Sequence, residues 1–330
     1  MNILVTGGYG FIFSNFIRHM INKYPDYKIV NIDKLTYAAN TTNLADIENN
    51  KNYKFYKGDI CDKNLIEKIL KEEKIHVVVN AAAETHVDRS ISDVSNFLAT
   101  NVLGTFTLLE AAKKAGIEKF IQISTDEVYG DTMQGSFKET DKLNPRNPYA
   151  ASKASGDLLA MSYFTTHGLP VTITRSTNNY GPFHYPEKFI PKAIIYALTN
   201  KKIPVYGEGK EIRDWLFVQD NCEAVDLVMH KGKPGEIYNI AGKQELQNIE
   251  VVKSILSSMC KDESLIEFVK NRPAHDRRYS LDIEKIRQLG WQPRTNFNEG
   301  IAKTMDWFEK NRAWWMPAFS KQQLDFHKNF

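Results

Sequence analysis

The chain contains 330 residues, of which 42% are hydrophobic and 25% are charged. These proportions are those of an ordinary globular protein, and they exclude a wholly disordered, collagen-like or coiled-coil chain. The 43 basic and 40 acidic residues leave a formal charge of +3, too weak a global field to predict binding to nucleic acid or to an anionic membrane. At roughly 150 residues per domain, the length predicts about two domains or one elaborated α/β domain.

The sequence predicts a cytoplasmic protein. Its first residues lack the basic start and long apolar stretch of a signal peptide, and no later run approaches the ~18 apolar residues of a membrane span. Cys61, Cys222 and Cys260 are scattered along the chain, which favours reduced, structural cysteines over disulfides. His86 and His275 lack the clustered spacing of metal ligands, so no metal site is expected.

Short apolar runs alternate with helix-length amphipathic segments through the first half of the chain. This alternation is typical of a parallel sheet covered on both faces. Strands are predicted at residues 3–6, 28–32, 53–56, 77–81, 120–124 and 171–175. Helices are predicted at residues 93–115 and 149–166, where apolar residues recur at helical spacing. The pattern predicts a Rossmann-type, doubly wound α/β domain over residues 1–178.

Residues 179–330 are less regular, and Gly181-Pro182, Tyr185-Pro186 and Ile190-Pro191 interrupt them. We expect them to form mainly a smaller α/β lobe, with some segments returning to the main sheet. Such a lobe would lie over the carboxyl ends of the strands, where the ligands of open α/β sheets bind.

A glycine-rich turn, Gly7-Gly8-Tyr9-Gly10-Phe11-Ile12, follows the first predicted strand. Glycines permit a tight turn and let the next helix offer its free N–H groups to a diphosphate. Asp33, after the second strand, is placed to accept hydrogen bonds from an adenosine ribose, which favours NAD over NADP. Taken alone, the glycine turn is equally well explained as a structural loop.

Phe13 departs from the glycine pattern, because the spacing of Gly7 and Gly10 calls for a third glycine at that position. The third glycine normally lets the helix lie close to the sheet. We therefore expect Phe13 to displace the helix or to turn its ring into an enlarged gap, and to weaken cofactor binding.

Two further motifs carry chemistry. Tyr149 and Lys153 are one helical turn apart on the same face, and a nearby ammonium favours the phenolate, which could take a proton from a sugar hydroxyl. Asp126 and Glu127 follow the fifth predicted strand, and adjacent carboxyls with separated pKa values can act as acid and base. Either motif alone could be structural, but together they indicate elimination of water.

In these motifs the chain resembles the dTDP-glucose 4,6-dehydratases of the extended short-chain dehydrogenase/reductase family. The triplet Thr125-Asp126-Glu127 discriminates better than Tyr149 and Lys153, since epimerases of the family share the latter pair. The matching segments, which run essentially from end to end, are residues 7–12, 33–37, 82–90, 124–130, 147–153, 178–182, 186–188, 213–215 and 272–279.

The resemblance implies an internal redox cycle on a nucleotide-linked glucose, with tightly bound NAD that is regenerated in each turnover. Tyr149 would deprotonate the C4 hydroxyl while the C4 hydride is transferred. Glu127 would then remove the C5 proton, and Asp126 would protonate the departing C6 hydroxyl before hydride returns to C6. Thr125 would bond to the sugar at C4, and Lys153 would hold the nicotinamide ribose and lower the pKa of Tyr149.

The same resemblance implies two binding sets. The cofactor set is Gly7, Gly10, Phe11, Ile12, Asp33, Lys34, Thr36, Asp59, Ile60, Ala81, Ala82, Ala83, Thr100, Tyr149, Lys153 and Asn179. The substrate set is Thr85, Thr125, Asp126, Glu127, Asn178, Lys188, Phe189, Pro204, Val205, Tyr206, Arg213, Asn248, Arg272 and His275. Because cationic side chains bind phosphate oxygens, and guanidinium groups do so bidentately, we expect Lys188, Arg213 and Arg272 to converge on one diphosphate.

Three alternative functions stay open. The same chemistry could act on UDP-glucose or another nucleotide sugar. A nucleotide-sugar 4-epimerase would need Tyr149 but not Asp126 and Glu127, and a catalytically silent NAD-binding protein is suggested only by Phe13. The resemblance also implies a homodimer in which the predicted helices 93–115 and 149–166 pack against their mates.

Overall fold

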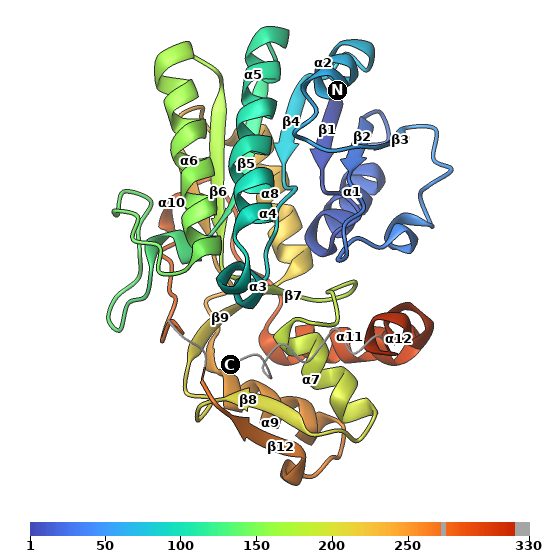
Figure 1. Cartoon of the computed structure of the whole chain (residues 1–330), viewed down its shortest axis with the longest axis vertical. Helices are drawn as coiled ribbons and strands as arrows, with labels where there is room; N and C mark the ends of the chain where they lie inside the picture. The colour runs from blue at the N-terminus through green and yellow to red at the C-terminus, as the bar shows by residue number, and fades with distance from the viewer. Residues whose placement is uncertain (272–274, 321–330) are drawn as a thin grey trace.

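The computed structural model describes residues 1–271 and 275–320. A seven-stranded parallel sheet forms its larger part, in the order β10-β6-β5-β4-β1-β2-β3 (Figure 1). The first six strands lie within one residue of their predicted bounds, and the predicted α/β class is confirmed. The strands are β1 (Asn2–Thr6), β2 (Lys28–Asp33), β3 (Tyr53–Lys57), β4 (Val77–Asn80), β5 (Lys119–Thr125), β6 (Val171–Ser176) and β10 (Ile237–Ile240).

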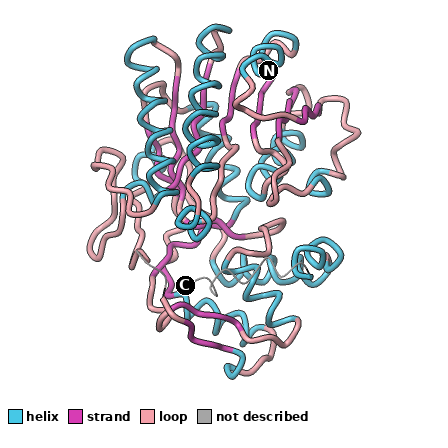
Figure 2. The backbone as a smooth tube through the Cα atoms, in the orientation of Figure 1, coloured by secondary structure: helices cyan, strands magenta, loops and turns pink. Residues whose placement is uncertain are grey.

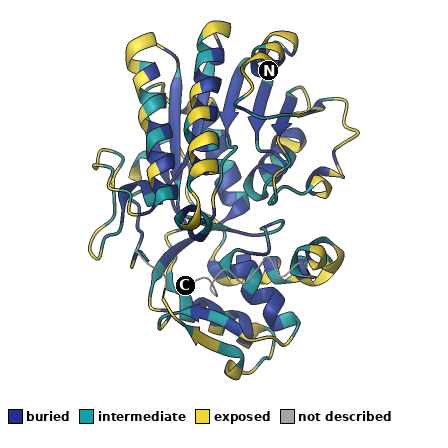
Figure 3. Cartoon of the chain, in the orientation of Figure 1, coloured by how far each residue is buried: buried dark blue, intermediate teal, exposed yellow. Residues whose placement is uncertain are grey.

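Helices cover both faces of this sheet. One layer consists of α1 (Phe11–Lys23), α8 (Val218–Lys231) and α10 (Glu284–Gln288), and the other of α2 (Lys63–Glu72), α5 (Thr105–Ala115) and α6 (Pro148–His167). The strands between them are almost wholly buried, while the outer faces of α5 and α6 are exposed (Figure 3). Burial on both faces explains why the strands read as continuous apolar runs in the sequence.

A buried carboxylate fixes α1 to α8. Asp226 accepts hydrogen bonds from His19 Nε2 at 2.9 Å, Lys23 Nζ at 2.6 Å and Tyr24 Oη at 3.1 Å. A buried charge is tolerated when several donors surround it in this way. The C-terminal half of α1 is thereby anchored, and its N-terminus is held at the edge of the sheet where β1 ends.

The smaller lobe combines short sheets with flanking helices (Figures 1 and 2). β7 (Asn178–Tyr180), β9 (Ile212–Phe217) and β11 (Glu245–Gln247) form one sheet, and β8 (Ile203–Tyr206) and β12 (Ile266–Val269) form the other. The helices are α7 (Phe189–Leu198), α9 (Asn248–Ser258), α11 (Phe297–Lys310) and α12 (Arg312–Ser320). Their shared core includes Tyr180, Phe308 and Trp315, which are fully buried. The segment from α8 to β10 separates parts of this lobe in sequence and belongs to the main sheet.

The helix predicted over residues 93–115 is divided into three parts. α4 (Ser95–Phe97) is followed by a π-helical segment, η2 (Leu98–Gly104), and then by α5. Asn101 in η2 bonds to the backbone N–H and C=O of Glu84 at 2.9 and 3.1 Å and to Ser152 Oγ at 2.9 Å. The π-helical turn thus coincides with a side chain that ties α6 to the loop after β4, as such turns often do near functional sites.

Short helical elements follow several of the strands. α3 (Val87–Ser92) follows β4, and the 3₁₀ turn η3 (Asp126–Tyr129) follows β5. A further 3₁₀ turn, η1 (Thr41–Leu44), lies after β2, and η4 (Glu263–Leu265) precedes β12. Within residues 1–271 and 275–320, no helix has the length and apolarity to cross a membrane.

Candidate active site

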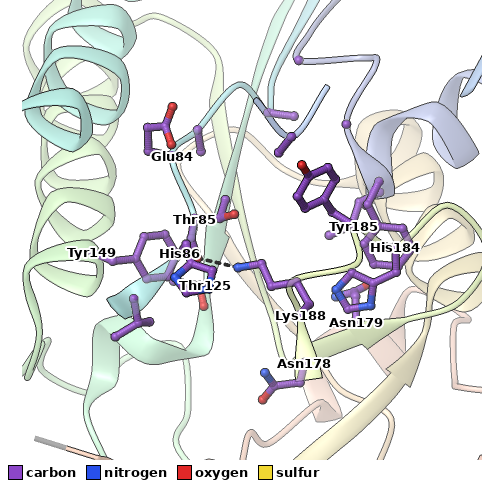
Figure 4. Close-up of a pocket in the computed structure, with 18 of the residues that line it drawn as sticks. Glu84, Thr85, His86, Thr125, Tyr149, Asn178, Asn179, His184, Tyr185 and Lys188 are labelled. Carbon is purple, nitrogen blue, oxygen red and sulfur yellow. Dashed lines mark hydrogen bonds between the residues drawn. The ribbon is translucent and has the colours of Figure 1, made fainter. Parts of the chain in front are cut away.

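A cavity of about 480 Å³ lies between the carboxyl ends of the main strands and the smaller lobe. Figure 4 shows its two walls: Glu84, Thr85, Thr125 and Tyr149 come from the main-sheet side, and Asn178, Asn179, His184, Tyr185 and Lys188 from the opposite side. We call these the sheet wall and the lobe wall. A volume of this size is typical of a small-molecule site.

The cavity brings together every residue of the predicted cofactor set. It also contains the predicted substrate residues, with two exceptions. Val205 does not line it: on β8, Pro204 and Tyr206 face the cavity, whereas the Val205 side chain is buried in the lobe core. Successive strand residues point to opposite faces, so placing the Val205 side chain in the site is a mistake. Arg272 lies outside the described residues.

The glycine turn joins β1 to α1 by close backbone contact. Gly7 has φ +72°, and a Cβ there would lie 2.8 Å from Ala82 Cα. A Cβ on Gly8 would lie 2.3 Å from Asn31 Oδ1 and 2.4 Å from Ile17 Cδ1. No side chain caps the start of α1 at Gly10, so its first N–H groups are available to an anion in the cavity.

Phe13 turns its ring inward, which is the second of the two placements expected from the motif. Its side chain is 4% exposed and lies in the main core, where its ring is 5.4 Å from that of Phe16. The tight approach of α1 to the sheet occurs at Gly8 and Ile17 instead. The ring is therefore accommodated in the core, and the expected weakening of cofactor binding by Phe13 stays a prediction.

Asp33 lines the cavity and can accept further hydrogen bonds. Its Oδ2 accepts from Tyr9 N at 2.9 Å and its Oδ1 from Leu35 N at 2.8 Å. Burial raises the pKa of this carboxyl, and the two backbone hydrogen bonds oppose that effect. A carboxylate has about four acceptor sites, so two stay available for hydroxyls. Beside it, Lys34 Nζ pairs with Asp59 Oδ2 at 2.7 Å.

Tyr149 and Lys153 are carried by the first turns of α6. Asn147 caps this helix by accepting from Ala150 N at 2.8 Å, and Pro148 occupies the first turn. Lys153 Nζ donates to Ile123 O at 2.5 Å, and burial lowers its pKa to about 8. Burial and the neighbouring Glu127 raise the pKa of Tyr149, against a hydrogen bond with Thr125. The lowering of this pKa by Lys153 stays a prediction for the site with its ligands bound.

Asp126 and Glu127 occupy the start of η3, which Thr125 caps. Asp126 is 3% exposed, and its Oδ2 has no hydrogen-bond partner. Burial and the charge of Glu127 raise its pKa well above the ordinary value, while the Thr125 hydrogen bond and Arg213 oppose the rise. Glu127 Oε2 accepts from Asn147 Nδ2 at 3.1 Å. Burial therefore favours the protonated form of Asp126, which is the form that a proton donor requires.

Of the predicted cationic residues, Lys188 and Arg213 line the cavity, and both donate hydrogen bonds to backbone carbonyls. Lys188 Nζ donates to Thr85 O at 2.8 Å, a bond that joins the two walls (Figure 4). Arg213 donates to Ile212 O at 2.8 Å and to Asp276 O at 2.9 Å, and it lies 4.4 Å from the ring centre of Tyr279. Their predicted convergence on one diphosphate stays a prediction.

Several cavity residues carry buried polar atoms without a partner. They are Asp126 Oδ2, Thr177 Oγ1, Asn178 Oδ1, Asn179 Oδ1 and His184 Nδ1. Each such atom costs roughly 1–3 kcal/mol unless a bound molecule satisfies it. Together with the uncapped α1 and the free acceptor sites of Asp33, these atoms fit a dinucleotide and a second polar ligand.

The sequence analysis missed several cavity residues although they stand inside the motifs that it quoted. Glu84, His86 and Asp88 lie in the matched segment 82–90, Glu187 lies in 186–188, and Tyr279 ends the last segment. His184 and Tyr185 lie just beyond the segment 178–182. Tracing each motif onto the sheet edge would have found the first group; the second depends on how the lobe folds back.

Comparison with known proteins places this site in a family. The model of the GDP-mannose 4,6 dehydratase family matches residues 4–304. A dTDP-glucose 4,6-dehydratase of Escherichia coli is 46% identical, over 96% of this chain and 95% of its own. A trifunctional UDP-glucose 4,6-dehydratase of Arabidopsis thaliana is also 46% identical, over 95% of this chain and 48% of its own.

A solved structure agrees with this assignment. The dTDP-glucose 4,6-dehydratase of Bacillus anthracis, crystallised in complex with NAD, is 48% identical, superposes with a TM-score of 0.91, and is matched over 96% of this chain and 99% of its own. The resemblance drawn from the motifs is therefore confirmed. The chain belongs to the nucleotide-sugar 4,6-dehydratase family, within the extended short-chain dehydrogenases/reductases.

Proposed function

We propose that this protein converts dTDP-glucose to dTDP-4-keto-6-deoxyglucose and water with bound NAD. The observation that carries the proposal is that Asp126, a buried carboxyl whose pKa burial raises, lies next to Glu127 in the cavity that also contains Tyr149. A 4-epimerase needs only the Tyr149 step, whereas dehydration needs a separate acid and base.

Each protein group has a distinct task in this reaction. Tyr149 accepts the proton of the C4 hydroxyl, Glu127 accepts the C5 proton, and Asp126 donates its proton to the C6 hydroxyl as water leaves. The protonated Glu127 returns a proton to C5 when hydride adds to C6. When bound, NAD supplies the hydride acceptor for C4 and the hydride donor for C6, and its nicotinamide adds a positive charge that favours the Tyr149 phenolate. Thr125, bonded to Tyr149, orients the phenol toward the sugar.

The base of the nucleotide is the finer question. Relatives named for dTDP-glucose and for UDP-glucose are both 46% identical to this chain, so identity does not separate them. The test is incubation of the purified protein with dTDP-glucose and UDP-glucose in parallel, with products identified by mass and NMR. A faster reaction of dTDP-glucose to its 4-keto-6-deoxy product is expected. Formation of the galactose epimer would contradict the proposal.

We further propose a homodimer, with the cytoplasm as the compartment predicted from the sequence. On the outer face of η2, α5 and α6, Leu98, Leu103, Phe106 and Leu158 are 50%, 52%, 42% and 63% exposed. Large exposed apolar side chains grouped on one helical layer favour contact with another chain. Light scattering of the wild type should give twice the mass of one chain. The Leu158→Glu variant should give the mass of a single chain.

A further inference from the structure

The loop between β7 and α7 holds one histidine against the start of α1. Phe183 has φ +67°, in the left-handed region that bulky residues rarely adopt. Its ring lies 4.7 Å from that of Trp307 and 4.7 Å from the Arg18 guanidinium carbon. On the α1 side, Asn15 Nδ2 donates to Pro182 O at 3.1 Å. These contacts outweigh the backbone strain and fix the position of the next residue, His184.

The His184 ring is buried and stacks on Phe11. It is 9% exposed, its ring centre lies 4.1 Å from that of Phe11, and the planes are 12° apart. Phe11 is the first residue of α1, so the imidazole lies beside the helix end whose N–H groups face the cavity. Burial, with a smaller effect of the Lys188 charge, lowers the pKa of His184 well below its ordinary value.

Without a ligand, one ring nitrogen of this histidine makes no hydrogen bond. Nδ1 is buried without a hydrogen-bond partner, and His184 lines the cavity on the lobe wall, near Asn179 and Lys188 (Figure 4). A neutral imidazole still carries one N–H donor. A buried donor beside a helix N-terminus suits an anionic oxygen, because both present N–H groups to the same volume.

We propose that His184 is a cofactor-binding residue whose Nδ1–H donates a hydrogen bond to the diphosphate of the dinucleotide, while its ring stacks on Phe11. The proposal rests on the proposed function, and it adds a contact from the lobe to the helix dipole of the main domain. The dinucleotide would be held from both walls at its diphosphate. This second hold supports a cofactor that stays bound through each turnover.

The test separates the hydrogen bond from the stacking. In His184→Phe the ring is kept and the donor is lost, whereas in His184→Gln an amide donor of similar reach replaces the ring. His167→Phe, at an exposed histidine at the end of α6, is the matched control. The NAD content of each purified protein and its rate of NAD release are measured, without reference to turnover.

A hydrogen bond to a charged group predicts roughly 10- to 100-fold faster NAD release from His184→Phe. Release from His184→Gln should stay within a few-fold of wild type, and His167→Phe should be unchanged. Wild-type retention in His184→Phe, or equal losses in both His184 variants, would overturn the proposal. If the wild type converted dTDP-glucose but the variants did not differ, only the His184 assignment would fail.

A measurement on the wild type covers the case in which a variant does not fold. Protein with ¹⁵N-labelled histidine is stripped of nucleotide, and its imidazole signals are recorded before and after addition of NAD. The His184 Nδ1–H signal should move downfield on addition, as for a hydrogen bond to phosphate. An unchanged signal at saturating NAD would refute the contact.

Discussion

The two walls of the cavity differ in how far their polar groups are already partnered. On the sheet wall, both oxygens of Asp33 accept backbone N–H groups and Lys153 donates to Ile123 O. On the lobe wall, Asn178 Oδ1, Asn179 Oδ1 and His184 Nδ1 are buried without partners. The contrast indicates that the sheet wall is organised before ligands bind, whereas the lobe wall is completed by them.

Asp126 is the informative exception on the sheet wall. Its Oδ2 is also unpartnered, and burial together with Glu127 raises its pKa. A rigid sheet end can hold a carboxyl buried and without a partner because the strand and its cap do not relax. The sheet wall therefore supplies the chemistry, and the lobe wall supplies affinity. Variants on each wall can therefore test this division between chemistry and affinity.

The largest effect is expected for the acid and base. Asp126→Asn and Glu127→Gln each keep the size of the side chain but remove the proton transfer, so kcat for dehydration should fall by about 10²- to 10⁴-fold. Turnover is measured by formation of the 4-keto product, with folding checked by circular dichroism. Asp141→Asn, in an exposed loop, should match wild type. Wild-type turnover in both site variants would show that Asp126 and Glu127 are not the acid and base of the reaction.

The second expected effect is on the stability of the protein, through the core behind the sheet wall. Phe13→Ala removes a buried ring from the core behind the glycine turn, and it should lower the free energy of unfolding by about 3–5 kcal/mol. Urea denaturation of the nucleotide-free protein measures it. An unchanged or increased stability would mean that Phe13 strains the turn after all.

A smaller effect is expected on the lobe wall. Arg213→Gln should raise KM for dTDP-glucose roughly 10- to 100-fold, the loss expected for a hydrogen bond to a charged group, and change kcat much less. Steady-state kinetics separates the two parameters. If kcat fell as far as in Asp126→Asn with KM unchanged, the division between the walls would be wrong, and Arg213 would act mainly on Asp126.

The smallest effect is a pH dependence. Because burial lowers the pKa of Lys153 to about 8, its ammonium is lost as the pH rises past that value, and kcat/KM should decline several-fold there. Lys153→Arg stays charged throughout this range and should lose that decline, whatever its absolute rate. The same alkaline decline in both proteins would assign it to another group.

The sheet wall could be predicted in detail because its signals are local. Continuous apolar runs predicted the strands. Gly7, Asp33 and Thr125 stand at the ends of β1, β2 and β5, so they meet at one edge of the sheet. The lobe wall depends on how distant segments fold together. Tertiary packing decides which side of β8 Val205 occupies, and it brings Lys153 to Ile123 and His184 to Phe11. These contacts leave no pattern in the sequence.

An internal redox cycle in one cavity would move the C4 hydrogen of the sugar to C6, so a label at C4 follows the whole cycle. Purified protein is incubated with dTDP-glucose deuterated at C4, and the product is examined by mass and NMR. The account predicts a 4-keto-6-deoxy product with the deuterium at C6. Deuterium lost to solvent, or found at C4 of dTDP-galactose, would contradict it.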